Sequence, residues 1–208
     1  MPEVQQPPDP RTGARRPQQQ RSREKVARIL AATGRLLEEH PYDEIGTRLI
    51  AAEAGVSVGV LYRFFPDKEA IVASLVRDWL RRFVEISQDT AAGPLPERPE
   101  DLHRLLIEAY ADFFRSEPGF RRIWWGGPRI PMLQSESDAN DQDVADTVHA
   151  LLVGHYGAPD TPEARRRTLM AVVLVGHLLN LAFRDRPEGD PQVLSEAAVL
   201  LDRYLVFP

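Results

Sequence analysis

Residues 47–65 read TRLIAAEAGVSVGVLYRFF and decide the fold. Two short helices that cross closely need a small residue in the first helix and a glycine in the turn between them. Ala51 is that small residue, and Gly55 follows at a turn position suited to left-handed backbone. The apolar residues spaced to lock the pair together are Ile50, Ala54, Val56 and Leu61. The stretch therefore predicts a helix-turn-helix.

The second helix of such a motif enters the major groove of DNA with its N-terminal end leading. On the face opposite Leu61, the residues predicted to contact DNA are Ser57, Val58, Gly59, Tyr62 and Arg63. Thr47 is expected to cap the first helix, through Ala54, and Ser57 the second, through about Phe64. Capping alone would explain both residue types, but the two roles can coexist.

Helical periodicity continues on both sides of this motif. A preceding helix is predicted from Arg21 to the His40-Pro41 break, and a long helix from Pro66 to about Gln88. Further helices are expected around 102–114 and at 119–125, 139–156, 162–184 and 190–206. Because no stretch alternates apolar and polar residues as a strand does, the expected fold class is all-α.

The chain of 208 residues suits a small domain followed by a larger one. The proline- and glutamine-rich residues 1–20 are expected to form a flexible arm. A helix-turn-helix domain is predicted over 21–67, and a larger helical domain for ligand binding and dimerisation over 68–208. The arginines of the arm are either solvated or reach a narrow minor groove.

Charge location favours nucleic-acid binding more than total charge does. The net charge is −5, but residues 1–35 hold eight basic residues against three acidic ones. The acidic excess therefore lies elsewhere, and a basic surface for phosphate remains available.

Several function classes are not expected. The absence of cysteine excludes disulfides, thiolate nucleophiles and Cys-ligated zinc, and His103, His149 and His155 lack zinc-binding spacing. No metal site or cofactor is predicted, and no enzyme, because the sequence has no nucleophile elbow, P-loop or dinucleotide fingerprint. The apolar stretch 169–183 is interrupted by His177 and Asn180, so we expect a cytoplasmic protein without a membrane segment.

Residues 54–70, AGVSVGVLYRFFPDKEA, resemble the signature of the tetracycline-repressor (TetR) family, and the resemblance covers about residues 22–72. It implies phosphate contacts from Thr47, Arg48 and Lys68, and a phosphate or base contact from Tyr62. Arg63 stands where the family often has histidine, so the resemblance assigns it no definite contact. Tyr62 alone would suit a half-buried packing aromatic, and Lys68 alone a solvated charge.

A ligand site is expected in the larger domain, for an apolar or aromatic small molecule. Its predicted lining residues are Trp79, Phe83, Tyr110, Phe113, Trp124, Trp125, His177 and Asn180. The aromatic residues would equally suit a plain core, and His177 and Asn180 would equally find partners within the protein. A cavity of roughly 300 Å³ or more between Tyr110, Trp124 and His177 would favour a ligand. An anionic ligand is the alternative, because Arg121, Arg122 and Arg129 could bind an anion at the entrance of the site.

The last two helices are apolar over more than one face, which suggests a dimer interface. By resemblance, they would form a four-helix bundle across a two-fold axis and present both recognition helices to a near-palindromic operator in double-stranded DNA. Ligand binding beside the long helix would then change the spacing of the two heads and release the operator. The competing hypothesis is a DNA-binding regulator with no small-molecule effector, which represses constitutively, activates, or answers to a protein partner.

Overall fold

The computed structural model describes residues 11–126 and 131–206, and all regular structure within these ranges is helical. The first part of the chain comprises α1 (Arg11–Glu39), the 3-10 turn η1 (Tyr42–Glu44), α2 (Thr47–Glu53), α3 (Val58–Phe64) and α4 (Lys68–Ala92). The second part comprises α5 (Pro99–Ser116), α6 (Pro118–Gly126), α7 (Pro131–Tyr156), α8 (Pro162–Phe183) and α9 (Pro191–Tyr204). The all-α prediction is confirmed.

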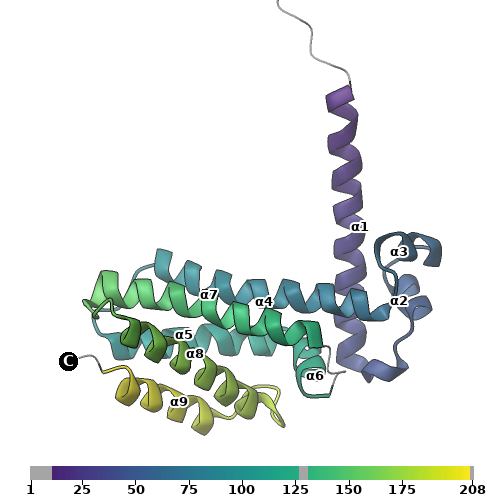
Figure 1. The fold of residues 1–208 in the computed structure, drawn as a ribbon. Helices are drawn as coiled ribbons and strands as arrows, with labels where there is room; N and C mark the ends of the chain where they lie inside the picture. The colour runs from purple at the N-terminus through teal and green to yellow at the C-terminus, as the bar shows by residue number, and fades with distance from the viewer. Residues whose placement is uncertain (1–10, 127–130, 207–208) are drawn as a thin grey trace, which may run out of the picture.

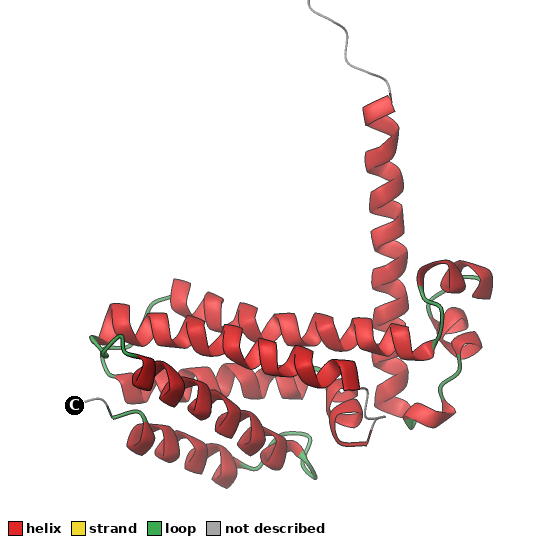
Figure 2. Cartoon of the chain, in the orientation of Figure 1, coloured by secondary structure: helices red, strands yellow, loops and turns green. Residues whose placement is uncertain are grey.

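Figure 1 shows the arrangement of these helices. The long helices α4, α5, α7, α8 and α9 form one elongated bundle, and α1 crosses its end. Beside α1 lie α2 and α3, and the short loops between elements are drawn in green in Figure 2. Since α4 leaves the α1–α3 unit and runs through the bundle, it physically joins the two parts.

The helix starts follow from local capping. The Ser57 hydroxyl accepts a hydrogen bond from the Val60 amide at 3.2 Å, and Asp67 accepts one from the Ala70 amide at 2.7 Å. Ser57 was predicted as a cap, and this is confirmed. Thr47 was also expected to cap, but the cap of α2 is Gly46, and Thr47 is the first helical residue. Its side chain is therefore free for another partner.

Several predicted bounds differ from the observed ones. Helix α1 begins at Arg11 rather than Arg21, so residues 11–20 are helical and not the expected arm. Pro17 costs about 3 kcal/mol in a helix interior, which is why the sequence predicted an arm. The neighbouring arginines and glutamines have high helix propensity, which favours the helix. Residues 1–10 of the expected arm lie outside the described part of the chain.

Two other helices are longer than the sequence predicts. The helix expected at 139–156 begins at Pro131, and α4 continues to Ala92 rather than to about Gln88. The added residues, PMLQSESD at 131–138 and DTAA at 89–92, are too short to show a helical apolar period of their own.

The apolar core is continuous from the α1–α3 unit into the bundle. Ile29 and Leu61 are fully buried in the first part, and Trp79 and Phe120 are buried where α4 and α6 meet. A shared core of this kind lets packing changes in the bundle reach the first three helices.

Helix α8 has apolar surface that is not buried within this chain. By length and composition alone it is apolar enough to cross a membrane, yet only 33% of its most apolar stretch is buried. This finding differs from the expectation that the sequence contains no candidate membrane-spanning segment. The exposed large apolar residues on one side of the helix are Met170, Val173, Leu174 and Leu181.

Candidate functional site

The α2–α3 unit is locked by the residues that the sequence singled out. Ile50, Ala51 and Leu61 are almost completely buried, and Ala54 is only 6% exposed. Gly55 has φ of +62°, a left-handed conformation that favours glycine. The two helices therefore hold a fixed crossing, and the second one presents its outer face in a defined orientation.

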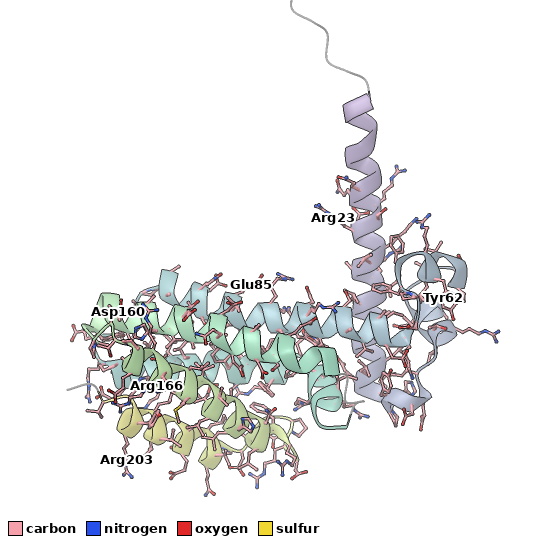
Figure 3. All side chains as sticks on the ribbon, in the orientation of Figure 1. Arg23, Tyr62, Glu85, Asp160, Arg166 and Arg203 are labelled. Carbon is pink, nitrogen blue, oxygen red and sulfur yellow. The ribbon has the colours of Figure 1, made fainter. Side chains whose placement is uncertain are left out.

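That outer face is exposed as predicted. Tyr62 is 50% exposed, and Figure 3 shows it on the side of the molecule away from the bundle. The other exposed members of the predicted set are Arg48, Ser57, Gly59 and Arg63, while Thr47, Val58 and Lys68 are half-buried. All eight predicted residues lie on α2, on α3 and its N-terminal cap, or at the start of α4.

Thr47 and Tyr62 are brought into direct contact. The Thr47 hydroxyl and the Tyr62 hydroxyl lie 3.1 Å apart, which joins the start of α2 to the middle of α3. This pairing orients the tyrosine hydroxyl while leaving its second hydrogen-bonding position open. A free hydroxyl held in place suits contact with a phosphate oxygen.

Lys68 has a fixed position rather than a freely solvated one. Its ammonium group donates to the Tyr42 carbonyl at 2.9 Å and lies 3.9 Å from the centre of the Tyr42 ring. The Tyr42 hydroxyl donates to Glu69 at 3.1 Å, and burial together with Glu69 raises the pKa of this hydroxyl. An ammonium group has three N–H donors, so Lys68 retains donors for a phosphate.

A narrow cavity runs through the bundle between α4, α5, α7, α8 and α9. Its volume is about 120 Å³, smaller than the roughly 300 Å³ that would favour a ligand site over a regulator without an effector. Of the predicted ligand residues, Phe83, Tyr110 and Asn180 line it. Tyr110 is held by Ser87 and by the Phe83 carbonyl, and burial raises its pKa to about 12.

Other predicted ligand residues lie elsewhere. Trp79 does not line the cavity: its indole N–H donates to Glu117 at 3.0 Å, which ties α4 to the junction between α5 and α6. Phe113 packs against Phe83 with ring centres 4.6 Å apart. His177 is exposed and bonds the Val173 carbonyl within its own helix, so α8 turns it away from the core. The side chains of Trp124 and Trp125 lie outside the described residues, as does Arg129.

Sequence reasoning missed most of the polar lining. The polar residues that line the cavity besides Tyr110 and Asn180 are His103, Ser137, Asn140, Asp141 and Thr168. A helical spacing connects Ser137, Asn140 and Asp141 to the lining residues Val144 and Val148 on α7. That pattern of a polar end on an apolar stripe was present in the sequence and could have identified them.

The cavity contains buried polar groups with unmet hydrogen-bonding capacity. His103 is 3% exposed, and its Nδ1 pairs with Asp202 at 2.9 Å. The opposite ring nitrogen, Nε2, and the Asn180 Oδ1 are buried without a partner among the described residues. Burial, followed by the nearby charge of Asp138, raises the pKa of Asp141. Such groups are costly unless something else satisfies them.

Comparison with known proteins agrees with this architecture. Residues 97–208 match the family described as tetracyclin repressor-like, C-terminal domain, and residues 29–75 match the bacterial regulatory proteins of the tetR family. The chain belongs to the TetR family. TetR-family proteins are DNA-binding transcriptional regulators, and the resemblance noted in the sequence is confirmed.

Two curated TetR-family relatives each match less than half of this chain. The regulator EthR of Mycolicibacterium smegmatis is 34% identical over 99 residues, which are 48% of this chain and 45% of that protein. The repressor KstR of Mycobacterium tuberculosis is 36% identical over 75 residues, which are 36% of this chain and 34% of that protein. The chain thus spans less than half the length of these two relatives.

Solved TetR-family structures match over nearly the whole chain. A TetR-family regulator from Streptomyces coelicolor is 31% identical with a TM-score of 0.65, covering 87% of this chain and 97% of that one. The regulator FadR of Bacillus subtilis, solved in complex with stearoyl-CoA, is 16% identical with a TM-score of 0.63, covering 86% and 97%. The latter likeness shows a shared fold.

Proposed function

We propose that this TetR-family protein is a cytoplasmic homodimeric repressor, not an enzyme, that binds a near-palindromic operator and leaves it when a small apolar or aromatic effector enters the bundle cavity. The observation that carries the proposal is the exposed Thr47–Tyr62 pair on a rigid helix-turn-helix, joined through α4 to a buried cavity.

DNA contact is supported by the chemistry of the exposed face. Arg48 and Arg63 supply charge for phosphates, and Tyr62 supplies an oriented hydroxyl. Ser57, Val58 and Gly59 are small enough at the start of α3 to let the backbone approach base edges. Lys68, anchored over Tyr42, adds a charge at the start of α4.

Dimerisation is supported by the unburied side of α8. Leu174 is 40% exposed, Leu181 47% and Met170 49%, all within one helix. A chain with such a surface gains by burying it against a second copy, at about 25 cal/mol per Å² of apolar area. We propose the interface through α8 and α9, because a two-fold arrangement presents both recognition helices to two half-sites.

Release is supported by the shared helix α4. Its first residue, Lys68, lies beside the DNA-facing surface, and Phe83 of the same helix lines the cavity. A ligand that prefers a different tilt of α4 would change the spacing between the two heads. A tenfold loss of operator affinity needs about 1.4 kcal/mol of coupling.

A second candidate function is a DNA-binding regulator without a small-molecule effector. The observation that favours it is the cavity volume of about 120 Å³, below the usual range of ligand sites. The FadR structure supports the effector proposal, because a protein of the same fold was solved in complex with stearoyl-CoA.

The first experiment measures binding of the purified protein to the DNA upstream of its own gene, across a salt series. We expect saturable binding to a near-palindrome that weakens with salt. Tyr62→Phe should lower affinity about tenfold, since a hydrogen bond to a charged group contributes about 1.5 kcal/mol. Tyr156→Phe is the matched control, because that hydroxyl donates to the Pro96 carbonyl in the bundle.

Absence of specific binding at that site calls for selection from random DNA. Recovery of a near-palindrome would support the proposal with a distant operator. Recovery of no preferred sequence would contradict it.

A further inference from the structure

We infer that the bundle cavity takes a slim, apolar ligand that carries a hydroxyl or amine group and that it rejects carboxylates. This inference rests on the proposed effector role of the cavity and specifies the chemical class of the effector. It is drawn from the shape of the cavity and from the polar groups that face it.

The cavity is long relative to its volume. Thr168 and Asn180 both line it and are twelve residues apart on α8, which corresponds to about 18 Å of helix. The volume of about 120 Å³ compares with an engineered cavity of about 150 Å³ that holds benzene. The ligand that fits without widening the bundle is therefore a short, narrow chain.

The groups left open to a ligand are acceptors. The Asn180 Oδ1 is buried without a partner among the described residues, and an amide oxygen only accepts. The His103 Nε2 is likewise unpartnered, and in the tautomer whose Nδ1–H donates to Asp202 it is also an acceptor. A ligand completes these groups by bringing an O–H or N–H donor.

Two hydroxyls of the lining, those of Tyr110 and Thr168, are already engaged. The Tyr110 hydroxyl lies within hydrogen-bond reach of Ser87 and the Phe83 carbonyl, and Thr168 donates to the Ala164 carbonyl at 3.1 Å. A ligand acceptor placed at the Tyr110 or Thr168 hydroxyl would have to displace one of these bonds. A ligand donor at the Asn180 Oδ1 faces no such competition.

The charge of the lining points the same way. Asp141 lines the cavity, whereas the described lining residues include no lysine or arginine. Arg121 and Arg122, the residues for which the sequence analysis kept an anionic ligand as an alternative, are not among them. A buried carboxylate would therefore lack a counter-charge and face Asp141, while an ammonium group would find one.

The test uses three probes that share the same linear carbon skeleton and differ in the polar group: hexan-1-ol, hexylamine and hexanoate. Ligand-observed NMR at neutral pH, on the full-length protein without DNA, measures their affinities directly. We expect the alcohol and the amine to bind at least about tenfold more tightly than hexanoate, because only hexanoate buries an unpaired charge. Hexanoate binding as tightly as hexan-1-ol overturns the inference, and so does failure of both hexan-1-ol and hexylamine to bind.

Two variants place the effect at the proposed groups. Asp141→Asn should weaken the amine and narrow the difference between alcohol and hexanoate, whereas Asp143→Asn, an exposed neighbour on α7, should change neither. Asn180→Leu should weaken hexan-1-ol about fivefold, as expected for one lost hydrogen bond. Unchanged affinities for hexylamine and hexanoate in Asp141→Asn contradict the charge argument. Operator binding of the probe-free protein is measured separately, so failure of the DNA-binding proposal is distinguished from failure of the ligand class.

Discussion

Gly119 of α6 lies directly against the backbone of Gly34 in α1: a Cβ atom on Gly119 would stand 2.7 Å from the Gly34 carbonyl oxygen. The next residue, Phe120, lines the bundle cavity. Two adjacent residues of one short helix thus face the cavity and the helix that braces the DNA-binding unit. For the effector proposed above, this contact would be a second route, beside α4, from the cavity to the recognition helix.

Replacing Gly119 by alanine should destabilise this junction. The oxygen belongs to backbone, which cannot rotate away, so we expect the free energy of unfolding in urea to fall by about 1–3 kcal/mol. Gly154→Ala is the control, because no atom lies within 4 Å of its Cβ position in α7 and alanine favours a helix. Equal stability of the two variants would mean that α1 and α6 can separate without cost.

Thr47→Val tests whether Thr47 orients Tyr62. Valine keeps the shape of threonine but removes the hydroxyl that lies 3.1 Å from the tyrosine hydroxyl. Loss of one neutral hydrogen bond of about 0.5–1 kcal/mol should lower operator affinity about two- to fivefold in an anisotropy titration. Thr147→Val, which removes an exposed hydroxyl bonded to the Asp143 carbonyl, should leave that affinity unchanged. A matching loss in both variants would point to a general effect on folding.

Leu174→Asp should disrupt the proposed dimer. A carboxylate in the middle of the exposed α8 face would be buried without a partner in the dimer. We therefore expect the dimer dissociation constant, measured by analytical ultracentrifugation, to rise by at least about a hundredfold. Leu105→Asp is a closely matched control, since Leu105 on α5 is 43% exposed and Leu174 is 40% exposed. A dimer that survives Leu174→Asp but not Leu105→Asp would place the interface on α5.

Asp141→Asn should alter the pH dependence of stability. Burial, then Asp138, raises the folded-state pKa of Asp141 above the ordinary value of about 3.9, with His177 acting in the opposite direction. The folded state therefore binds the proton more tightly, and this group's contribution to stability falls as pH rises from about 3.9 through the raised pKa. The variant should be more stable than the wild type in urea at neutral pH, and this gain should shrink as pH falls through that window. A gain that grows on acidification would contradict the assignment, and Asp143→Asn controls for surface charge.

Local chemistry made the DNA-binding unit predictable. Gly55, Ser57 and the apolar positions around Leu61 act within a few residues of one another, so their pattern is complete in one short stretch of sequence. The cap at Thr47 was predicted wrongly because a threonine and a preceding glycine both fit the start of a helix. The ligand residues were less predictable, since an aromatic stripe has the same periodicity whether it faces a cavity, as Phe83 does, or packs beside it, as Phe113 does.

The sequence alone determined the helical fold, the helix-turn-helix and its exposed face, because turn geometry, capping and helical periodicity depend on neighbouring residues. Only the tertiary structure decided that His103, Asp141 and Asn180 share one narrow cavity, and that Gly119 rests on Gly34. These residues lie on different helices far apart in the chain. Their meeting depends on how each helix is rotated and crossed, which the packing of side chains from the whole bundle sets together.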